Sequence, residues 1–210
     1  RIQELTPEIA KSLGLKNEEG VLISMVNPGE PAEKGGLKSG DVILEFNGKK
    51  IKDVKSLQRT VAESAVESKA KVKVWRDKKE KNFTVKLGEL EKFNTTNAEK
   101  SDSNKEVVSD EVEIDEVGLR LLGLNKETRS KYNISKNVKG VVITAVKRDS
   151  FAAKAGLNVG NVISKIAQKD IERPAKAKQI FNEFLNKNSD AILLQVFEGD
   201  FSRFLILKLK

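Results

Sequence analysis

The chain has no histidine and no cysteine among its 210 residues, and it has only one tryptophan and one tyrosine. These absences exclude histidine-dependent catalytic triads, cysteine nucleophiles, zinc sites built from cysteine or histidine, and disulfide bonds. No apolar run approaches the roughly 18 residues that a membrane-spanning helix needs. We therefore expect a soluble chain with no enzyme activity of its own, no metal, no other cofactor and no membrane insertion.

The composition predicts small hydrophobic cores. Apolar residues make up 38% of the chain and charged residues 33%, whereas aromatic residues make up only 5%. Cores built mainly from valine, isoleucine and leucine suit two small domains better than one large domain, and 210 residues are enough for two.

The net charge of +8 is unevenly distributed along the chain. Residues 1–88 contain 18 Lys and Arg against 13 Asp and Glu, residues 89–115 contain 3 against 9, and residues 116–210 contain 18 against 9. Two basic regions therefore flank an acidic one. The lysines are scattered, with no arginine-rich run and no interleaved aromatic residues for base stacking, so we expect no nucleic-acid partner.

The acidic region also lacks the periodicity of regular structure. Residues 91–106 are polar and show neither a period of 2 nor one of 3.6, so they cannot bury enough apolar surface to offset the entropy of ordering. A segment this long without elements is uncommon inside one compact domain. We expect a flexible linker here.

An internal repeat supports this division. Shifting the sequence by 120 residues aligns residues 20–26 (GVLISMV) with residues 140–146 (GVVITAV) without a gap. The register continues from residues 31–43 (PAEKGGLKSGDVI) to residues 151–163 (FAAKAGLNVGNVI). The chain is therefore a duplicated domain.

Each copy is predicted to be rich in strands, with short helices. In the first copy we expect strands at residues 20–26, 41–46, 49–51, 71–75 and 83–87, and helices at residues 31–35 and 53–64. Asn47-Gly48 is the dipeptide that best closes a tight hairpin, and Asp53 is a helix N-cap candidate. The expected fold class is mainly β with short helices, a β-rich α+β class.

The residues also carry a family resemblance. Residues 28–51 (PGEPAEKGGLKSGDVILEFNGKKI) resemble the core signature of bacterial PDZ domains, and residues 1–15 (RIQELTPEIAKSLGL) resemble the opening of the first PDZ domain in the HtrA/Deg family of serine proteases. Two copies in tandem are similar to the DegP-like, Do-type branch. This predicts a PDZ-like domain at 1–90, a linker at 91–113 and a second PDZ-like domain at 114–210.

The resemblance implies a function for the parent protein. Family members carry an N-terminal chymotrypsin-like protease domain, and neither its triad nor its nucleophile motif occurs in these 210 residues. We expect the recognition and regulatory part of a periplasmic endoprotease of protein quality control and stress response. The expected partners are unfolded or misfolded polypeptides and their C-termini, the protease domain of the parent chain, and further copies in a homo-oligomer.

PDZ domains capture peptides by strand addition, in which an extended peptide pairs with an edge strand beside a helix. The resemblance implies that a loop before this strand offers backbone N–H groups to the peptide's terminal carboxylate. In the first copy the groove residues are expected to be Arg1, Ile2, Gln3, Leu5, Leu57 and Val61. In the second copy they are Val117, Gly118 and Leu119 in the loop, Arg120 and Leu121 beginning the edge strand, and Ala177 and Phe181 on the helix.

Two alternatives stay open at this point. The second copy could serve mainly to assemble subunits, a role that can coexist with recognition. The pair could also belong to another protease class, such as an intramembrane metalloprotease, in which spanning helices would flank it. In the groove helix, the spacing of Leu57, Val61 and Phe181 equally suits residues that belong to the core.

Overall fold

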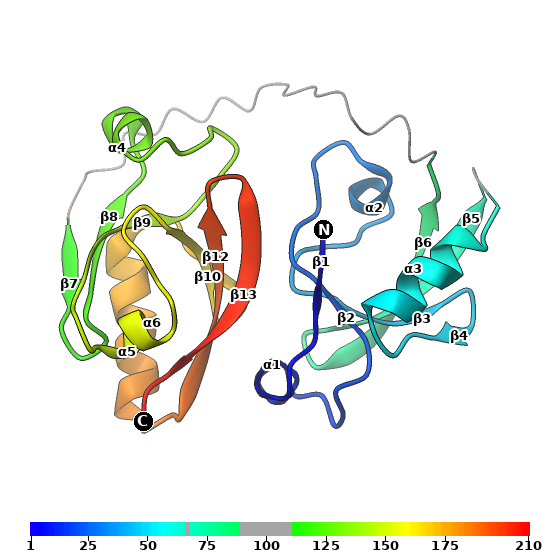
Figure 1. The fold of residues 1–210 in the computed structure, drawn as a ribbon, viewed down its shortest axis with the longest axis horizontal. Helices are drawn as coiled ribbons and strands as arrows, with labels where there is room; N and C mark the ends of the chain where they lie inside the picture. Colours follow the sequence, from blue (N-terminus) through cyan, green and yellow to red (C-terminus); the bar gives the residue numbers. More distant parts are fainter. Residues whose placement is uncertain (66–67, 89–110) are drawn as a thin grey trace. The chain divides into compact units, whose positions relative to one another are not determined.

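The computed structural model describes residues 1–65, 68–88 and 111–210. Its contacts divide the chain into two compact units, one ending at residue 103 and the other beginning at residue 104 (Figure 1). Each unit is an antiparallel sheet with three helices, so the predicted β-rich fold class is confirmed. The predicted linker at 91–106 lies outside the described residues.

The first unit has a sheet with the strand order β1-β2-β3-β5-β6, and β4 pairs with β3 beside this path. The strands are β1 (Ile2–Glu4), β2 (Val21–Ile23), β3 (Val42–Phe46), β4 (Lys49–Lys50), β5 (Lys69–Arg76) and β6 (Lys79–Lys86). The helices are α1 (Pro7–Ser12), α2 (Pro31–Lys34) and α3 (Val54–Ala62). The buried residues of its core cluster are aliphatic apart from Phe46.

The second unit repeats this plan with one more strand. Its sheet has the order β13-β12-β10-β9-β8-β7, and β11 pairs with β10. The strands are β7 (Val112–Ile114), β8 (Leu119–Gly123), β9 (Val141–Val146), β10 (Val162–Ile166), β11 (Lys169–Asp170), β12 (Ala191–Glu198) and β13 (Phe201–Lys208). The helices are α4 (Lys126–Lys131), α5 (Phe151–Lys154) and α6 (Pro174–Asn186).

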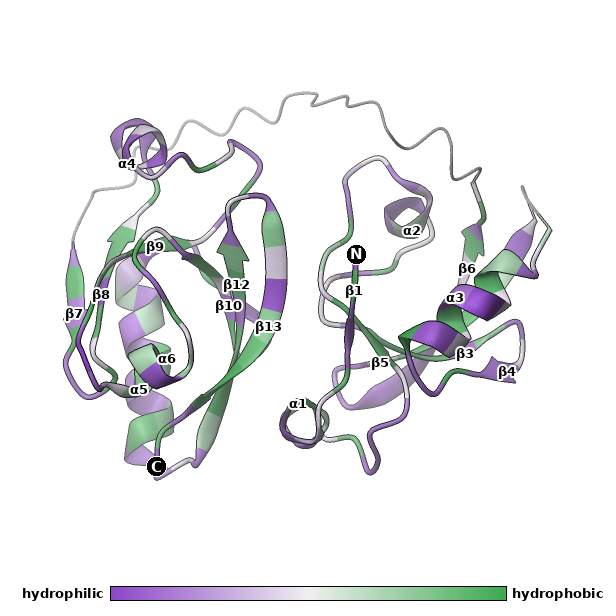
Figure 2. Ribbon diagram, in the orientation of Figure 1, coloured by the Kyte–Doolittle hydropathy of each residue, from purple (hydrophilic) through white to green (hydrophobic). Residues whose placement is uncertain are grey.

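Local signals produce most of these elements as predicted. Asn47 and Gly48 adopt φ values of 49° and 78°, the left-handed conformation that a tight β3–β4 hairpin requires. Asp53 caps α3 by accepting a hydrogen bond from the Ser56 N–H at 2.6 Å, and the Ser56 Oγ accepts a hydrogen bond from the Asp53 N–H at 3.0 Å. In both units the longer helix, α3 or α6, alternates hydrophobic and hydrophilic residues along its length (Figure 2).

Several boundaries differ from the prediction; the strands predicted at 71–75 and 83–87, for example, are longer in the structure, as β5 and β6. Two other differences have a structural cause. β2 covers only Val21–Ile23 of the predicted strand 20–26, because the N–H groups of both Ser24 and Met25 reach the carbonyl of Arg1, at 3.1 and 3.3 Å, and the regular ladder ends there. The second difference concerns the predicted linker at 91–113, whose last two residues, Val112 and Glu113, instead belong to strand β7.

Candidate peptide-binding grooves

The first unit has a sheet edge beside a helix. Strand β1 is the outermost strand on its side of the described sheet, and it pairs only with β2 there. Helix α3 is in contact with β1, and we call the surface between these two elements the first groove. The prediction of an edge strand at residues 1–3 therefore agrees with the sheet order, with the strand itself running from Ile2 to Glu4.

The hydrogen-bond pattern shows which backbone groups point into this groove. Ile23 lies opposite Ile2, and its N–H and C=O bond to the far side, to the Asp41 carbonyl at 2.8 Å and the Gly40 N–H at 2.9 Å. Residues opposite each other in an antiparallel pair alternate between bonded and non-bonded pairs. Ile2 therefore directs its own backbone N–H and C=O away from β2, toward the groove.

Apolar side chains border these groups. Ile2 on β1 is 37% exposed and Val61 on α3 is 38% exposed, and both are large hydrophobic residues at the surface. The two other apolar residues predicted for this groove lie deeper, because Leu5 and Leu57 are 7% and 5% exposed and Leu57 belongs to the main core. Leu57 thus provides the floor of the groove and Val61 its outer wall.

The capping residue Asp53 holds the start of this helix. Its carboxylate accepts a hydrogen bond from the Ser56 N–H, and hydrogen bonding with the backbone and the side chain of Ser56 lowers the pKa of Asp53 below its ordinary value. An ionised carboxylate is also favoured at a helix N-terminus. The helix wall of the groove is therefore best anchored when Asp53 is ionised.

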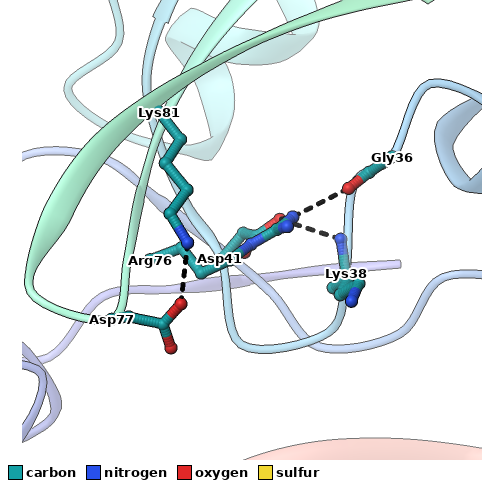
Figure 3. A network of polar contacts seen from close by, with 6 residues as sticks. All are labelled: Gly36, Lys38, Asp41, Arg76, Asp77 and Lys81. Atoms are coloured by element: carbon teal, nitrogen blue, oxygen red, sulfur yellow. Dashed lines mark hydrogen bonds and ion pairs between the residues drawn. The ribbon is translucent and has the colours of Figure 1, made fainter.

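A buried ion pair fixes the turn between α2 and β3 (Figure 3). Asp41, 1% exposed, accepts two hydrogen bonds of 2.5 Å from the Arg76 guanidinium and one of 2.8 Å from the Lys38 N–H. Arg76 also donates to the Gly36 carbonyl at 2.8 Å and stacks on the Phe83 ring. The hydrogen bond and charge of Asp41 raise the pKa of Arg76. This network is structural, because every group in it has a partner within the fold.

The second unit differs at the equivalent edge. Arg120 and Leu121 lie on β8, but β8 is not an edge strand, because β7 pairs with it on the outside (Figure 1). The prediction that Arg120 and Leu121 begin an edge strand is therefore wrong. In the register, Val112 lies opposite Leu121 and Ile114 lies opposite Leu119. The segment that covers the edge falls partly within the predicted linker, and the sequence signal for it was the alternation in Val112-Glu113-Ile114.

The N–H groups of the predicted carboxylate-binding loop already have hydrogen-bond partners within the second unit. The N–H groups of Val117 and Gly118 both donate to the Ile114 carbonyl, at 3.2 and 2.8 Å, closing the β7–β8 hairpin. Gly118 adopts a φ of 78°, and a Cβ there would lie 2.3 Å from the Ser150 Cβ, so only glycine fits. These N–H groups are therefore used within the fold and do not face a ligand.

The helix side of the second groove is buried. Ala177 and Phe181, the counterparts of Leu57 and Val61, are both fully buried, and they share one core cluster with Ile114, Leu119 and Leu121. Val117, Leu119 and Leu121 are likewise buried, at 0%, 2% and 0%. The structure thus brings the predicted apolar residues of the second groove together, but as part of a packed core that includes β7, whereas Arg120 is partly exposed beside Glu113.

Two shallow pockets of about 360 and 310 Å³ lie beside α2 and the end of β6. Pro31, Lys86 and Leu87 line both, Arg1 lines the smaller, and no residue of α3 lines either. These pockets do not coincide with the surface between β1 and α3. That surface is marked instead by its open strand edge and its exposed apolar residues. Within residues 1–65, 68–88 and 111–210, no group of acidic side chains could hold a metal ion, and no helix is long and apolar enough to cross a membrane.

Comparison with known proteins supports the resemblance found in the sequence. The PDZ domain family model matches residues 10–87. Over 99% of its length, the chain is 31% identical to a probable periplasmic serine endoprotease, DegP-like, of Rickettsia conorii and 33% identical to the protein of the same name of Bartonella henselae. It spans 41% and 39% of these two proteins. A solved structure, the HtrA-type protease AlgW with decapeptide, matches 42% of this chain and 27% of that one, at 34% identity and a TM-score of 0.39.

An antiparallel sheet with an edge strand facing a longer helix, together with the family match, defines the first unit as a PDZ domain, and the duplicated second unit has the same architecture. Over nearly its whole length, the chain is similar to a region of DegP-like proteins that makes up about two fifths of their length.

Proposed function

We propose that the first PDZ domain binds extended peptide segments, including apolar C-termini, by adding them as a strand beside β1. The observation that carries the proposal is the open edge at Ile2, whose backbone groups face α3 between the exposed side chains of Ile2 and Val61. Backbone pairing along such an edge gives affinity, and the apolar side chains that line it give selectivity for apolar residues. Arg1, Gln3, Leu5 and Leu57 complete the proposed site.

We propose further that the pair serves a periplasmic serine endoprotease of protein quality control. The names of the DegP-like relatives support this role. Because the chain has no histidine, the serine-protease triad of such a parent would lie in another domain. The proposed partners are unfolded or misfolded polypeptides, the protease domain of the parent and other copies in a homo-oligomer. Similarity to DegP-like proteins over 99% of this chain favours this class over an intramembrane metalloprotease.

Substituting Val61 tests the groove. Val61→Arg places a charged side chain on the wall that a peptide must contact, so we expect at least a tenfold loss of affinity for a peptide with an apolar C-terminal residue, measured by titration calorimetry. Because Val61 is exposed, the free energy of unfolding should change by only about 0.5 kcal/mol. The fluorescence of Trp75, the single tryptophan, reports on unfolding of this domain alone.

Val159→Arg is the matched control, because Val159 is a 53% exposed valine of the second unit outside both grooves. It should leave the calorimetric titration unchanged. Equal binding by Val61→Arg and the wild-type chain would show that peptides do not use the groove between β1 and α3.

A further inference from the structure

The two PDZ domains differ most at their grooves. Leu121 occupies in β8 the place that Ile2 occupies in β1, since each lies opposite an isoleucine of the next strand, Ile143 or Ile23. Ile2 is 37% exposed, whereas Leu121 is 0% exposed, and on the helices Val61 is 38% exposed, whereas Phe181 is 0% exposed. The same two positions are therefore open in one domain and covered in the other.

The backbone of Leu121 shows what covers it. Ile143 bonds away from β8, its N–H to the Asn161 carbonyl at 2.8 Å and its C=O to the Gly160 N–H at 2.9 Å, as Ile23 does in the first domain. Leu121 must therefore direct its N–H and C=O outward. Val112 of β7 lies directly opposite. In this domain a segment of the same chain takes the ladder position that a peptide would take beside Ile2.

The side chains of β7 are placed as those of a bound peptide would be. Ile114 is 1% exposed and belongs to the core cluster of Ala177 and Phe181, and Val112 packs against the same cluster. Glu113 points outward, where it meets the Arg120 guanidinium at 3.3 Å. Glu111, just before the strand, accepts a 2.6 Å hydrogen bond from the Thr144 hydroxyl. Apolar residues therefore fill the groove, and acidic residues hold its rim.

We propose that residues 112–114 are an intramolecular ligand of the second PDZ groove and keep it closed to other peptides. The proposal rests on the proposed function, because it takes the surface between β8 and α6 to be a strand-addition groove. It assigns to that groove an internal, extended segment in which aliphatic and acidic residues alternate. Only residues 115–118 join this segment to β8, so its local concentration is far above that of a free peptide, which must displace it to bind.

Hydrogen exchange of the full chain tests the assignment directly. The amide of Leu121 should exchange at least tenfold more slowly than that of Ile2, because β7 protects the former and nothing in the described sheet protects the latter. Equal exchange at the two positions would mean that β7 does not occupy the groove, and it would overturn the proposal.

A release variant, V112D with E113R, should open the groove by placing a charge against apolar residues and a cation opposite Arg120. We expect it to lose protection at Leu121 while Ile143 stays protected. Two probes, a capped peptide with the sequence of residues 110–115 and a peptide with an apolar C-terminus, should then shift the amide resonances of β8 and α6 at concentrations at least tenfold lower than in the wild-type chain. V159D with E172R, the same changes at exposed sites of this domain, is the control.

A locked variant, E113C with R120C, keeps the core unchanged. The two residues face each other in a non-bonded pair, where the strand Cα atoms are close enough for a disulfide, and the chain has no other cysteine. When oxidised, it should keep the wild-type protection at Leu121 and bind neither probe in the second groove.

The first domain serves as an internal reference in every titration. If β1 and α3 respond to the apolar peptide while the opened second groove of the release variant does not, β7 is not a ligand substitute and the inference is wrong. If the second groove of the locked chain binds a probe, the inference is also wrong. If β1 and α3 do not respond either, the proposed function fails.

Discussion

One of the differences between the two copies at the turn before β3 and β10 changes the charge of the capping residue. Asp41 in the first domain is Asn161 in the second, and both side chains accept a hydrogen bond from a backbone N–H three residues earlier, at Lys38 and Asn158. The carbonyls of Gly36 and Gly156 are each bound by an arginine, but Arg76 comes from β5 and Arg203 from β13. The turn needs its cap in both domains, whereas the ionic partner of the cap is particular to the first.

Asp41→Asn should therefore keep the turn but leave Arg76 without its anion. Because Asp41 is buried and Arg76 largely so, we expect a loss of about 2 kcal/mol in the free energy of unfolding of the first domain, measured by urea titration of Trp75 fluorescence.

Asp77→Asn is the control for that measurement. Asp77 forms an exposed pair with Lys81 in the same region (Figure 3), and such surface pairs contribute at most about 1 kcal/mol. A loss equal to that of Asp41→Asn would show that burial of the pair does not matter.

Among the elements, α3 links stability to pH. Hydrogen bonds from Ser56 lower the pKa of Asp53 in the folded chain, so the ionised cap stabilises the fold above the unfolded pKa of about 4, and this contribution is lost as the pH falls through the lower folded value. Asparagine caps helices as well and does not titrate. Between pH 7 and pH 2.5 the wild-type chain should therefore lose stability relative to Asp53→Asn.

Thermal unfolding followed by Trp75 fluorescence at both pH values measures this difference. All other carboxyl groups are common to the two proteins, so their contributions cancel. A difference in Tm that is the same at pH 7 and pH 2.5 would contradict the assignment of the lowered pKa to the folded state.

Strand β7 shows that a sequence pattern can indicate a strand without indicating which strand it pairs with. The alternation of Val112, Glu113 and Ile114 is typical of a strand with one buried face. Three residues at the end of an acidic stretch are nevertheless too few to distinguish a strand from a linker. Their strand conformation depends on the apolar surface that β8 forms with α6, and α6 begins only at Pro174, far along the chain.

At the scale of the whole molecule, the duplicated chain has two grooves in different states. The first is open beside Ile2, and the second is filled by β7. The first domain is therefore the one that we propose to bind peptides, and the second is the one that we propose for other contacts, including the assembly role that the sequence left open.

The linker at 91–106 is still a prediction from composition, and limited proteolysis tests it. A glutamate-specific protease should cut first among the glutamates of residues 89–106 and release two fragments, each containing one sheet, because both sheets are complete within their own units. Fragments that begin or end inside a described strand, or resistance of this segment, would mean that the two units are not joined by an open tether.

The sequence by itself determined the duplication, the absence of a catalytic triad and most of the elements, because repeats, hairpin dipeptides and helix caps act over a few residues. It also placed Ile2 on an edge strand and Leu57 and Val61 on a helix, as the structure has them. Only the tertiary structure decided which groove is open. The reason is that the residues of a strand do not by themselves specify which segment pairs with it. Whether a peptide or Val112 pairs with the outer side of Leu121 depends on which segment reaches that edge in the folded chain.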